Sequence, residues 1–251
     1  MEFQLYKIAL STVYLICLFL SLPNLPLKVA CDVSEAQAFL IWKSSIHIKT
    51  KPLLASWSKT KTSPCSWFGV SCNDAGRVTG INLAGSGLNG TLQNFPFSSF
   101  PNLVHLNLSM NELFGSIPPQ ISQLYNLIYL DLSTNRFSGE IPSSIGLLTH
   151  LEILNLSENQ LSDSIPEELG QLRSLDKLFL HNNNLHGVVP SSLDNLSKLT
   201  HLHLYNNPLS GSIPPELDRR LYERSYHELW NNQYSDKVHG PGGGRQPPAG
   251  V

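Results

Sequence analysis

The chain of 251 residues has little charge of either sign. Charged residues make up 14% of it, and 17 basic residues stand against 19 acidic ones, for a net charge of −2. Because no basic excess is available to hold a phosphate backbone, the composition argues against nucleic-acid binding. Hydrophobic residues reach 41%, which is enough for a packed core and excludes a wholly disordered chain.

Long apolar runs are also scarce, since only one is present. It covers residues 8–22 and ends at Pro23. It is shorter than the roughly 20 residues of a spanning helix and lies at the N-terminus, so residues 1–30 predict a signal peptide cleaved near Ala30 or Cys31. A retained signal anchor is the alternative. We expect a mature chain without a membrane span, in the extracellular space or at the cell surface (the apoplast, or the plasma membrane if this segment is retained or a longer form exists).

Motifs for catalysis, cofactors and metals are missing as well. The glycine-rich phosphate loop, His-Arg-Asp loop and Asp-Phe-Gly motif of kinases do not occur. Gly85, Gly87 and Gly90 spell GxGxxG, but the TLQNFPF that follows is not helix-like, which argues against a dinucleotide site. The nearby histidines in the last two repeats lack a cysteine or carboxylate that would complete a metal site. We therefore expect neither an enzyme nor a cofactor.

Leucine and asparagine, by contrast, are abundant, with 43 and 20 copies. Both recur every 24 residues, in the columns Leu103, Leu127, Leu151, Leu175, Leu199 and Asn111, Asn135, Asn159, Asn183, Asn207. The unit reads LxxLxLxxNxLxGxIPxxLxxLxx, and an imperfect earlier copy begins at Val78. This is the period and pattern of leucine-rich repeats, and it predicts six units over residues 78–217.

Each column of the repeat has a physical role. Leucines that alternate with polar residues have the period of a half-buried strand. Parallel stacking of these strands makes an inner sheet, and a column of asparagines can satisfy backbone groups where the chain turns. No repeat can bury its leucines alone, so stability must come from its neighbours.

The segment before the repeats carries its own signals. Ser34 and Gln37 fit a capping box at the start of a first helix. Cys17 falls within the signal peptide, whereas Cys65 and Cys72 close a short loop in a compartment where disulfides persist. We expect these two to be bonded and to fasten Trp67 over the first repeat. Cys31 is left over, and a zinc site is disfavoured because no second ligand pair exists.

These motifs together resemble one known family. LxGxIP segments at residues 113–118, 137–142, 185–190 and 209–214, and the upstream SEAQAFLIWKSSI, LLASW and PCSWFGVSC, are similar to the ectodomains of plant leucine-rich-repeat receptor-like kinases. The fourth repeat departs, with Asp163 in place of glycine. The resemblance covers residues 31–217 and assigns residues 31–77 to the N-terminal cap. It implies an α/β solenoid, a leucine-rich-repeat arc with a parallel inner sheet and a helical cap.

The resemblance also implies a function. In that family this region binds peptides, hormones or partner receptors, so we expect a peptide or protein ligand and a possible co-receptor, with no small-molecule cofactor. The alternative is a secreted inhibitor of cell-wall-degrading enzymes similar to the polygalacturonase-inhibiting proteins. Those proteins have more repeats and a disulfide-bonded C-terminal cap that this sequence lacks.

The outward strand positions of the last two repeats predict a ligand-binding patch. They are Lys177, Phe179, His181, His201, His203 and Tyr205. Exposed aromatics beside a cation are typical of interface centres. The same column earlier holds Asn82, Asn107, Asp131 and Asn155, which we interpret as polar filler. Because the histidines have an ordinary pKa near 6.5, we expect the patch to gain charge, and to bind an acidic ligand more tightly, as pH falls from about 7.5 to 5.5. The alternative is that these six residues arose by neutral substitution on a surface that accepts many side chains.

Two further expectations concern sequons and the C-terminal end. Glycosylation sequons begin at Asn89, Asn107, Asn155 and Asn195, and the last is the best candidate because it lies outside the strands.

Residues 218–251 no longer follow the repeat pattern. Apolar residues at near-helical spacing predict an amphipathic helix over residues 217–231 that covers the open end of the solenoid. The final GPGGGRQPPAGV is disordered on composition.

Overall fold

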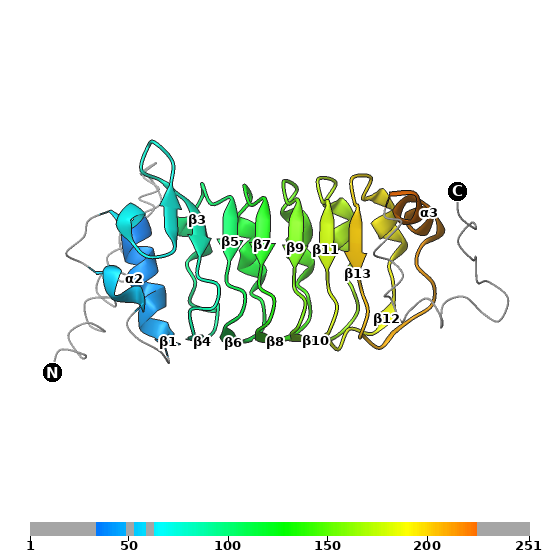
Figure 1. Cartoon of the computed structure of the whole chain (residues 1–251), viewed down its shortest axis with the longest axis horizontal. Helices are drawn as coiled ribbons and strands as arrows, with labels where there is room; N and C mark the ends of the chain where they lie inside the picture. The colour runs from blue at the N-terminus through cyan, green and yellow to red at the C-terminus, as the bar shows by residue number, and fades with distance from the viewer. Residues whose placement is uncertain (1–33, 49–52, 59–62, 225–251) are drawn as a thin grey trace, which may run out of the picture. The chain divides into compact units, whose positions relative to one another are not determined.

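The computed structural model describes residues 34–48, 53–58 and 63–224 (Figure 1). The expected signal peptide, Cys31 and the tail after residue 224 lie outside the described residues. The chain divides into two compact units, residues 1–34 and 35–251, and the second is described here by itself.

An inner sheet runs through the second unit (Figure 1). Its strand order is β13-β11-β9-β7-β5-β3-β2, and every pair is parallel except β2 with β3. Successive leucines such as Leu130 and Leu154 lie directly opposite each other and are fully buried. The strands are β2 (Val70–Cys72), β3 (Val78–Asn82), β5 (His105–Asn107), β7 (Tyr129–Asp131), β9 (Ile153–Asn155), β11 (Lys177–Phe179) and β13 (His201–His203).

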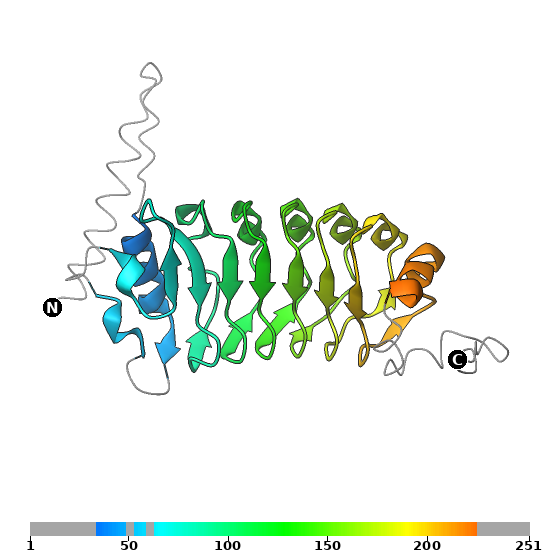
Figure 2. The same cartoon turned by 45° about the horizontal axis from the view of Figure 1, so that its top comes forward.

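Short strands and 3-10 helices complete each repeat (Figure 2). A second sheet has the order β1-β4-β6-β8-β10, and β12 pairs with β14 separately. These strands are β1 (His47–Ile48), β4 (Leu88–Gly90), β6 (Glu112–Gly115), β8 (Arg136–Gly139), β10 (Gln160–Leu161), β12 (Gly187–Val188) and β14 (Leu209–Ser210). The 3-10 helices of the repeats are η3 (Phe97–Ser99), η4 (Pro119–Gln123), η5 (Ser143–Leu147), η6 (Glu167–Gln171) and η7 (Ser191–Asn195).

The N-terminal cap is built around aromatic side chains. Helix α2 (Glu35–Ser45) buries Phe39 and Trp42 against Trp57 and Trp67, with ring centroids 4.6 to 6.3 Å apart. The cap also holds η1 (Leu53–Ser56) and η2 (Pro64–Ser66). The Glu35 carboxylate accepts hydrogen bonds from the Val78 backbone N–H at 3.1 and 3.2 Å, which joins the helix to the first repeat. Cys65 and Cys72 are disulfide-bonded, with their Cα atoms 5.5 Å apart.

The asparagine column satisfies backbone groups in two repeats at once. Asn135 Nδ2 donates to the backbone oxygens of Leu108, Leu132 and Ser133, and its Oδ1 accepts from the Leu113 N–H. The other asparagines of the column repeat this pattern, so each repeat is tied to its neighbours by buried amides.

A left-handed backbone position also recurs in every repeat. It is occupied by Gly85 in the first repeat and afterwards by residues with side chains, at φ of 53 to 61°, namely Met110, Thr134, Glu158, Asn182 and Asn206. The glycine of LxGxIP is left-handed too, and in the fourth repeat Asp163 takes that conformation at φ 69°. The second sheet is interrupted after β10 in this repeat.

The C-terminal end carries helix α3 (Pro215–Arg224), which contacts η7. The helix begins two residues earlier than the sequence predicted, and residues 225–231 of the expected helix lie outside the described residues. Leu217 and Leu221 are buried, and Asp194 Oδ1 accepts from the Leu217 N–H at 2.8 Å. The equivalent positions of the two preceding repeats hold Gly146 and Gly170, where an added Cβ would meet the backbone of the next repeat. At these glycines one repeat packs closely against the backbone of the next. Asp194 occupies the equivalent position in the fifth repeat, where its carboxylate caps α3.

Candidate ligand-binding site

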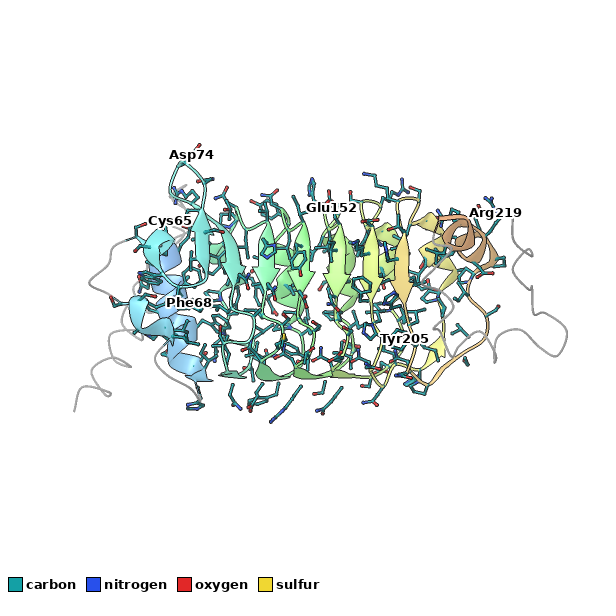
Figure 3. The ribbon with its side chains drawn as sticks, viewed as in Figure 1. Cys65, Phe68, Asp74, Glu152, Tyr205 and Arg219 are labelled. Atoms are coloured by element: carbon teal, nitrogen blue, oxygen red, sulfur yellow. A yellow bond between two sulfur atoms is a disulfide. The ribbon has the colours of Figure 1, made fainter. Side chains whose placement is uncertain are left out.

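Four of the six predicted site residues pack together on the inner face. His181 stacks on Tyr205 with ring centroids 4.5 Å apart, and Phe179 lies 4.8 Å from His203. A contact of 5.6 Å between the rings of His181 and His203 joins the two pairs. We call Phe179, His181, His203 and Tyr205 the aromatic–histidine cluster. Figure 3 shows Tyr205 beyond the end of β13, and all four side chains are half-buried.

The remaining two residues lie beside this cluster. Lys177 and His201 face each other in register on β11 and β13 and are half-buried. His201 Nδ1 lies 2.7 Å from the Thr200 hydroxyl, which also contacts the Asp176 carboxylate. The six residues therefore comprise an aromatic group and an adjoining basic pair, rather than one uniform patch.

His181 has an unusual environment. Its Nδ1 is buried and has no hydrogen-bond partner among the described residues. Burial lowers the pKa of His181, the nearby His203 lowers it further, and Glu158 opposes the shift. His181 therefore takes up its proton at a lower pH than a free imidazole, so it adds charge to the patch later than the sequence-based expectation assumed.

The N-terminal half of the inner face carries a different arrangement. Asn107, Asp131 and Asn155 each accept, through Oδ1, from the N–H and hydroxyl of the serine two residues later, with distances of 2.6 to 3.2 Å. We call these three Asx–Ser pairs the polar ladder. Asp131 is only 8% exposed and also accepts from Tyr129 Oη and Asn155 Nδ2. Polar filler was thus the wrong interpretation for Asp131, which is the centre of a buried network.

Two rings next to this ladder are affected by it. His105 stacks on Tyr129 with centroids 4.3 Å apart. Burial raises the pKa of Tyr129 to about 12, helped by the Asp131 carboxylate, so the phenol stays protonated and donates. Burial also lowers the pKa of His105, but here Asp131 opposes the shift.

The four sequons lie in different settings. Asn195 is exposed at the end of η7. Asn107 and Asn155 are half-buried members of the polar ladder, and Asn89 Nδ2 donates to Glu112 Oε2 at 3.2 Å. Asn195 is therefore the acceptor that a glycan would reach without disturbing a hydrogen bond described here.

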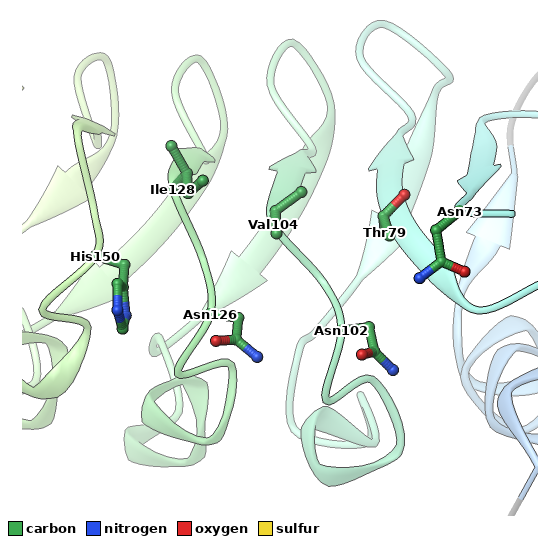
Figure 4. Close-up of a pocket in the computed structure, with 7 residues that line it drawn as sticks. All are labelled: Asn73, Thr79, Asn102, Val104, Asn126, Ile128 and His150. Atoms are coloured by element: carbon green, nitrogen blue, oxygen red, sulfur yellow. The ribbon is translucent and has the colours of Figure 1, made fainter. Parts of the chain in front are cut away.

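A groove on the inner face was not predicted from the sequence (Figure 4). It lies where the strands of the first repeats begin and has a volume of about 350 Å³. Its lining residues, which define the strand-start groove, are Asn73, Thr79, Asn102, Val104, Asn126, Ile128 and His150. The signal was present as a second 24-residue column, Asn102, Asn126 and His150, just before the first leucine of each repeat.

Within residues 34–48, 53–58 and 63–224, His, Cys, Asp and Glu form no group of three or more suited to a metal ion. No helix in the same described part of the chain has the length and apolar character needed to cross a bilayer.

Comparison with known families decides the identity of the repeat array. A family model of the leucine-rich repeat region matches residues 84–219, more than half of the chain. This chain belongs to the leucine-rich repeat family. The family model of the leucine-rich repeat N-terminal domain matches residues 33–73.

Individual relatives of this leucine-rich repeat protein are plant receptor kinases. A probable leucine-rich repeat receptor-like protein kinase of Arabidopsis thaliana is 46% identical over 99 residues, which is 38% of this chain and 9% of the kinase. The structure of pollen receptor kinase 3 has 36% identity and a TM-score of 0.65, covering 72% of this chain and 87% of the other. The Arabidopsis HAESA ectodomain, solved with an IDA peptide hormone, has 34% identity and a TM-score of 0.58, covering 73% and 35%.

These comparisons confirm the predicted resemblance and the α/β solenoid. The chain spans only 9% of the length of the curated kinase it matches. The alternative of an inhibitor of cell-wall-degrading enzymes is not favoured, because the solved relatives described here are receptor kinases.

Proposed function

We propose that this chain is an extracellular recognition module that binds a peptide or protein ligand through the C-terminal half of its inner face. The observation that carries the proposal is the paired replacement of the polar ladder by the aromatic–histidine cluster. Phe179 and His181 take the places that Asn155 and Ser157 hold one repeat earlier, and His203 and Tyr205 do so in the next repeat. Because both positions of the Asx–Ser pair change in two successive repeats, the pattern supports selection for a binding surface.

The chemistry of the cluster suits a peptide side chain. Half-buried rings offer apolar area that loses little conformational entropy on binding, and aromatic residues dominate the energetics of interface centres. Lys177 beside the rings supplies positive charge for an acidic group of the ligand, and His201 lies opposite it in register. The ligand that fits is an extended peptide with an apolar or aromatic residue next to an acidic one.

The family context supports the same class of ligand. The HAESA ectodomain, whose fold this chain shares, was solved with a peptide hormone, and a related structure includes the co-receptor SERK1. By this likeness the chain acts at the cell surface or in the apoplast, has no enzymatic activity of its own in this part, and engages a co-receptor. The predicted signal peptide and a glycan at Asn195 belong to the same proposal.

A peptide selection tests the site. Peptides selected from a random display library on the purified chain would be measured for Kd against wild type, a triple variant with Phe179→Ala, His201→Ala and His203→Ala, and Asn82→Ala as a control on the exposed face of the first repeat. We expect the triple variant to weaken binding at least about thirtyfold, the effect of losing a hot spot, and the control to bind normally. Peptides that bind the triple variant as tightly as wild type would place the site elsewhere.

A further inference from the structure

We propose that the strand-start groove is a binding site for a neutral, extended hexose oligosaccharide. It lies at the end of the N-terminal cap and in the first three repeats, on the side where the strands begin, whereas the aromatic–histidine cluster lies in the last two repeats. The proposal concerns a separate surface and does not depend on the peptide site.

The groove presents polar groups at a regular interval. Asn102, Asn126 and His150 occupy the same position of successive repeats, and their backbones are therefore spaced by about 5 Å, the separation of neighbouring strands. An extended β-linked hexose chain offers hydroxyl groups at a similar interval. Side-chain amides can both donate and accept, which is what a hydroxyl requires of its partner.

The amides are held in position by the protein. Asn126 Nδ2 donates to the Pro101 backbone oxygen at 2.8 Å, and His150 Nδ1 lies 3.1 Å from the Tyr125 backbone oxygen. Asn73 Oδ1 accepts from the N–H groups of Ala75 and Arg77 at 3.1 and 3.0 Å. These bonds fix the Asn73 amide with its nitrogen toward Asn102 (Figure 4). Asn126 Oδ1 and Asn73 Nδ2 are thus held in fixed positions by the other atom of each amide, and they can hydrogen-bond to a ligand.

The remaining lining consists of Thr79 and two aliphatic residues. Val104 and Ile128 form an aliphatic strip between the polar groups, and Ile128 is 40% exposed. Such a strip suits the C–H face of a sugar ring. The lining holds no carboxylate, lysine or arginine, whereas the next two repeats place Glu152 and Asp176 in the column of Val104 and Ile128. The absence of carboxylates, lysine and arginine from the lining favours a neutral ligand over an acidic polysaccharide or a charged peptide.

An added peptide strand is disfavoured by the backbone. The N–H groups beside the groove are already paired between repeats, as Val104 N with Thr79 O, Ile128 N with Val104 O, and Glu152 N with Ile128 O. Peptides that bind along a sheet obtain their affinity from unpaired main-chain groups, and the groove offers none at these positions. Its side chains are the groups left to contact a ligand.

Calorimetric titration of the full chain at pH 7.5 tests the proposal, with cellohexaose, a hexamer of galacturonic acid and a neutral six-residue peptide as probes. We expect cellohexaose to bind with a Kd on the order of 1 mM, typical of few hydrogen bonds in an open groove, and shorter oligomers to bind more weakly. Asn102→Ala with Asn126→Ala should weaken binding about tenfold. Absence of cellohexaose binding, or binding of only the acidic hexamer or only the peptide, would overturn the proposal.

A second variant guards against misfolding. Ile128→Glu copies the residue that the chain itself carries in this column one repeat later, so the fold should tolerate it, and it should abolish cellohexaose binding. Ser174→Ala, in the column of Asn102 and Asn126 but outside the groove, and Phe179→Ala, in the other site, should leave binding unchanged. Cellohexaose binding that survives Ile128→Glu would refute the assignment.

Discussion

The second to fourth repeats and the last two share one backbone but carry different side chains on the inner face. In the former, the polar ladder ties each Asx side chain to the serine two residues later. In the latter, the same positions hold rings that contact one another. Phe179 pairs in register with Asn155, so the strand geometry is the same in both regions.

The comparison separates what the fold needs from what it permits. Inward leucines and the asparagine column are present on both sides of the boundary. Within the strand segments, the residues that face outward from the inner sheet are the ones that change. Because repeats are stabilised by contacts with their neighbours, their outward positions are available for binding at little cost to stability.

The largest expected effect is on the free energy of unfolding, and it tests the asparagine column that both regions share. Asn135→Ala should lower the free energy of unfolding by about 3 kcal/mol, because several buried backbone groups lose their partner at once. The matched change Asn207→Ala should cost about half as much, because Asn207 in the last repeat is half-buried whereas Asn135 is buried. Denaturant unfolding measures both, and equal losses would show that the two regions do not differ in burial as described.

The second prediction concerns a variant in which the outward residues that differ between the two regions are exchanged. Phe179→Asn with His181→Ser gives the fifth repeat the ladder pair of the fourth. We expect unfolding to change by less than about 1 kcal/mol, because the new pair can form the hydrogen bonds that Asn155 and Ser157 make. Binding of the selected peptides should be lost. If this variant unfolds far more easily than wild type, the cluster is a structural element rather than a binding surface.

A third, smaller effect is expected at the boundary between the two regions. Asp163 adopts a left-handed φ of 69°, where the other LxGxIP segments have glycine. Asp163→Gly should stabilise the chain by about 0.5 kcal/mol, since relief of backbone strain exceeds the added freedom of the unfolded chain. The His186–Asp163 pair that is lost is exposed and 3.8 Å long, so it contributes little. The reverse control, Gly139→Asp, should destabilise.

Much of the fold could be predicted from the sequence because leucine and asparagine recur at a fixed spacing of 24 residues. Leucine spacing indicated the inner sheet, and Asp163 stood out as a departure. The left-handed column was missed because Met110, Thr134 and Glu158 share no residue type, so only the backbone reveals their common conformation. The start of α3 was placed two residues late, since its cap is Asp194 from the previous repeat rather than a local residue.

The candidate site was only partly predictable for a similar reason. Outward positions follow from alternation, and four of the six patch residues do lie on the adjacent strands β11 and β13, whereas His181 and Tyr205 lie just beyond the strand ends. Which rings touch, and that His181 Nδ1 is buried, depends on side-chain packing between repeats, which alternation does not specify. The burial of Asp131 was missed because an aspartate on an outward position is normally solvated.

The smallest effect concerns the half-buried His105 and His181, whose neighbours shift their pKa values in opposite directions. Burial lowers the pKa of both, but His203 lowers that of His181 further while Asp131 raises that of His105. His203→Phe should therefore raise the pKa of His181, and Asp131→Asn should lower the pKa of His105. Ring-proton NMR titration measures both, and shifts in the same direction would contradict the two environments described.

A stability consequence follows from the same shifts. The unfolded chain takes up these protons near pH 6.5, before the folded chain does, so the unfolded state binds more protons as pH falls and folding stability declines below that pH. His181→Phe removes one of the two groups, so wild type should lose more stability than this variant between pH 7.5 and 5.5. The acid sensitivity of the cluster comes first from the burial of His181 and is increased by the neighbouring His203, whereas Asp131 reduces the corresponding shift at His105. Parallel declines for wild type and His181→Phe would show that His181 is not the group responsible.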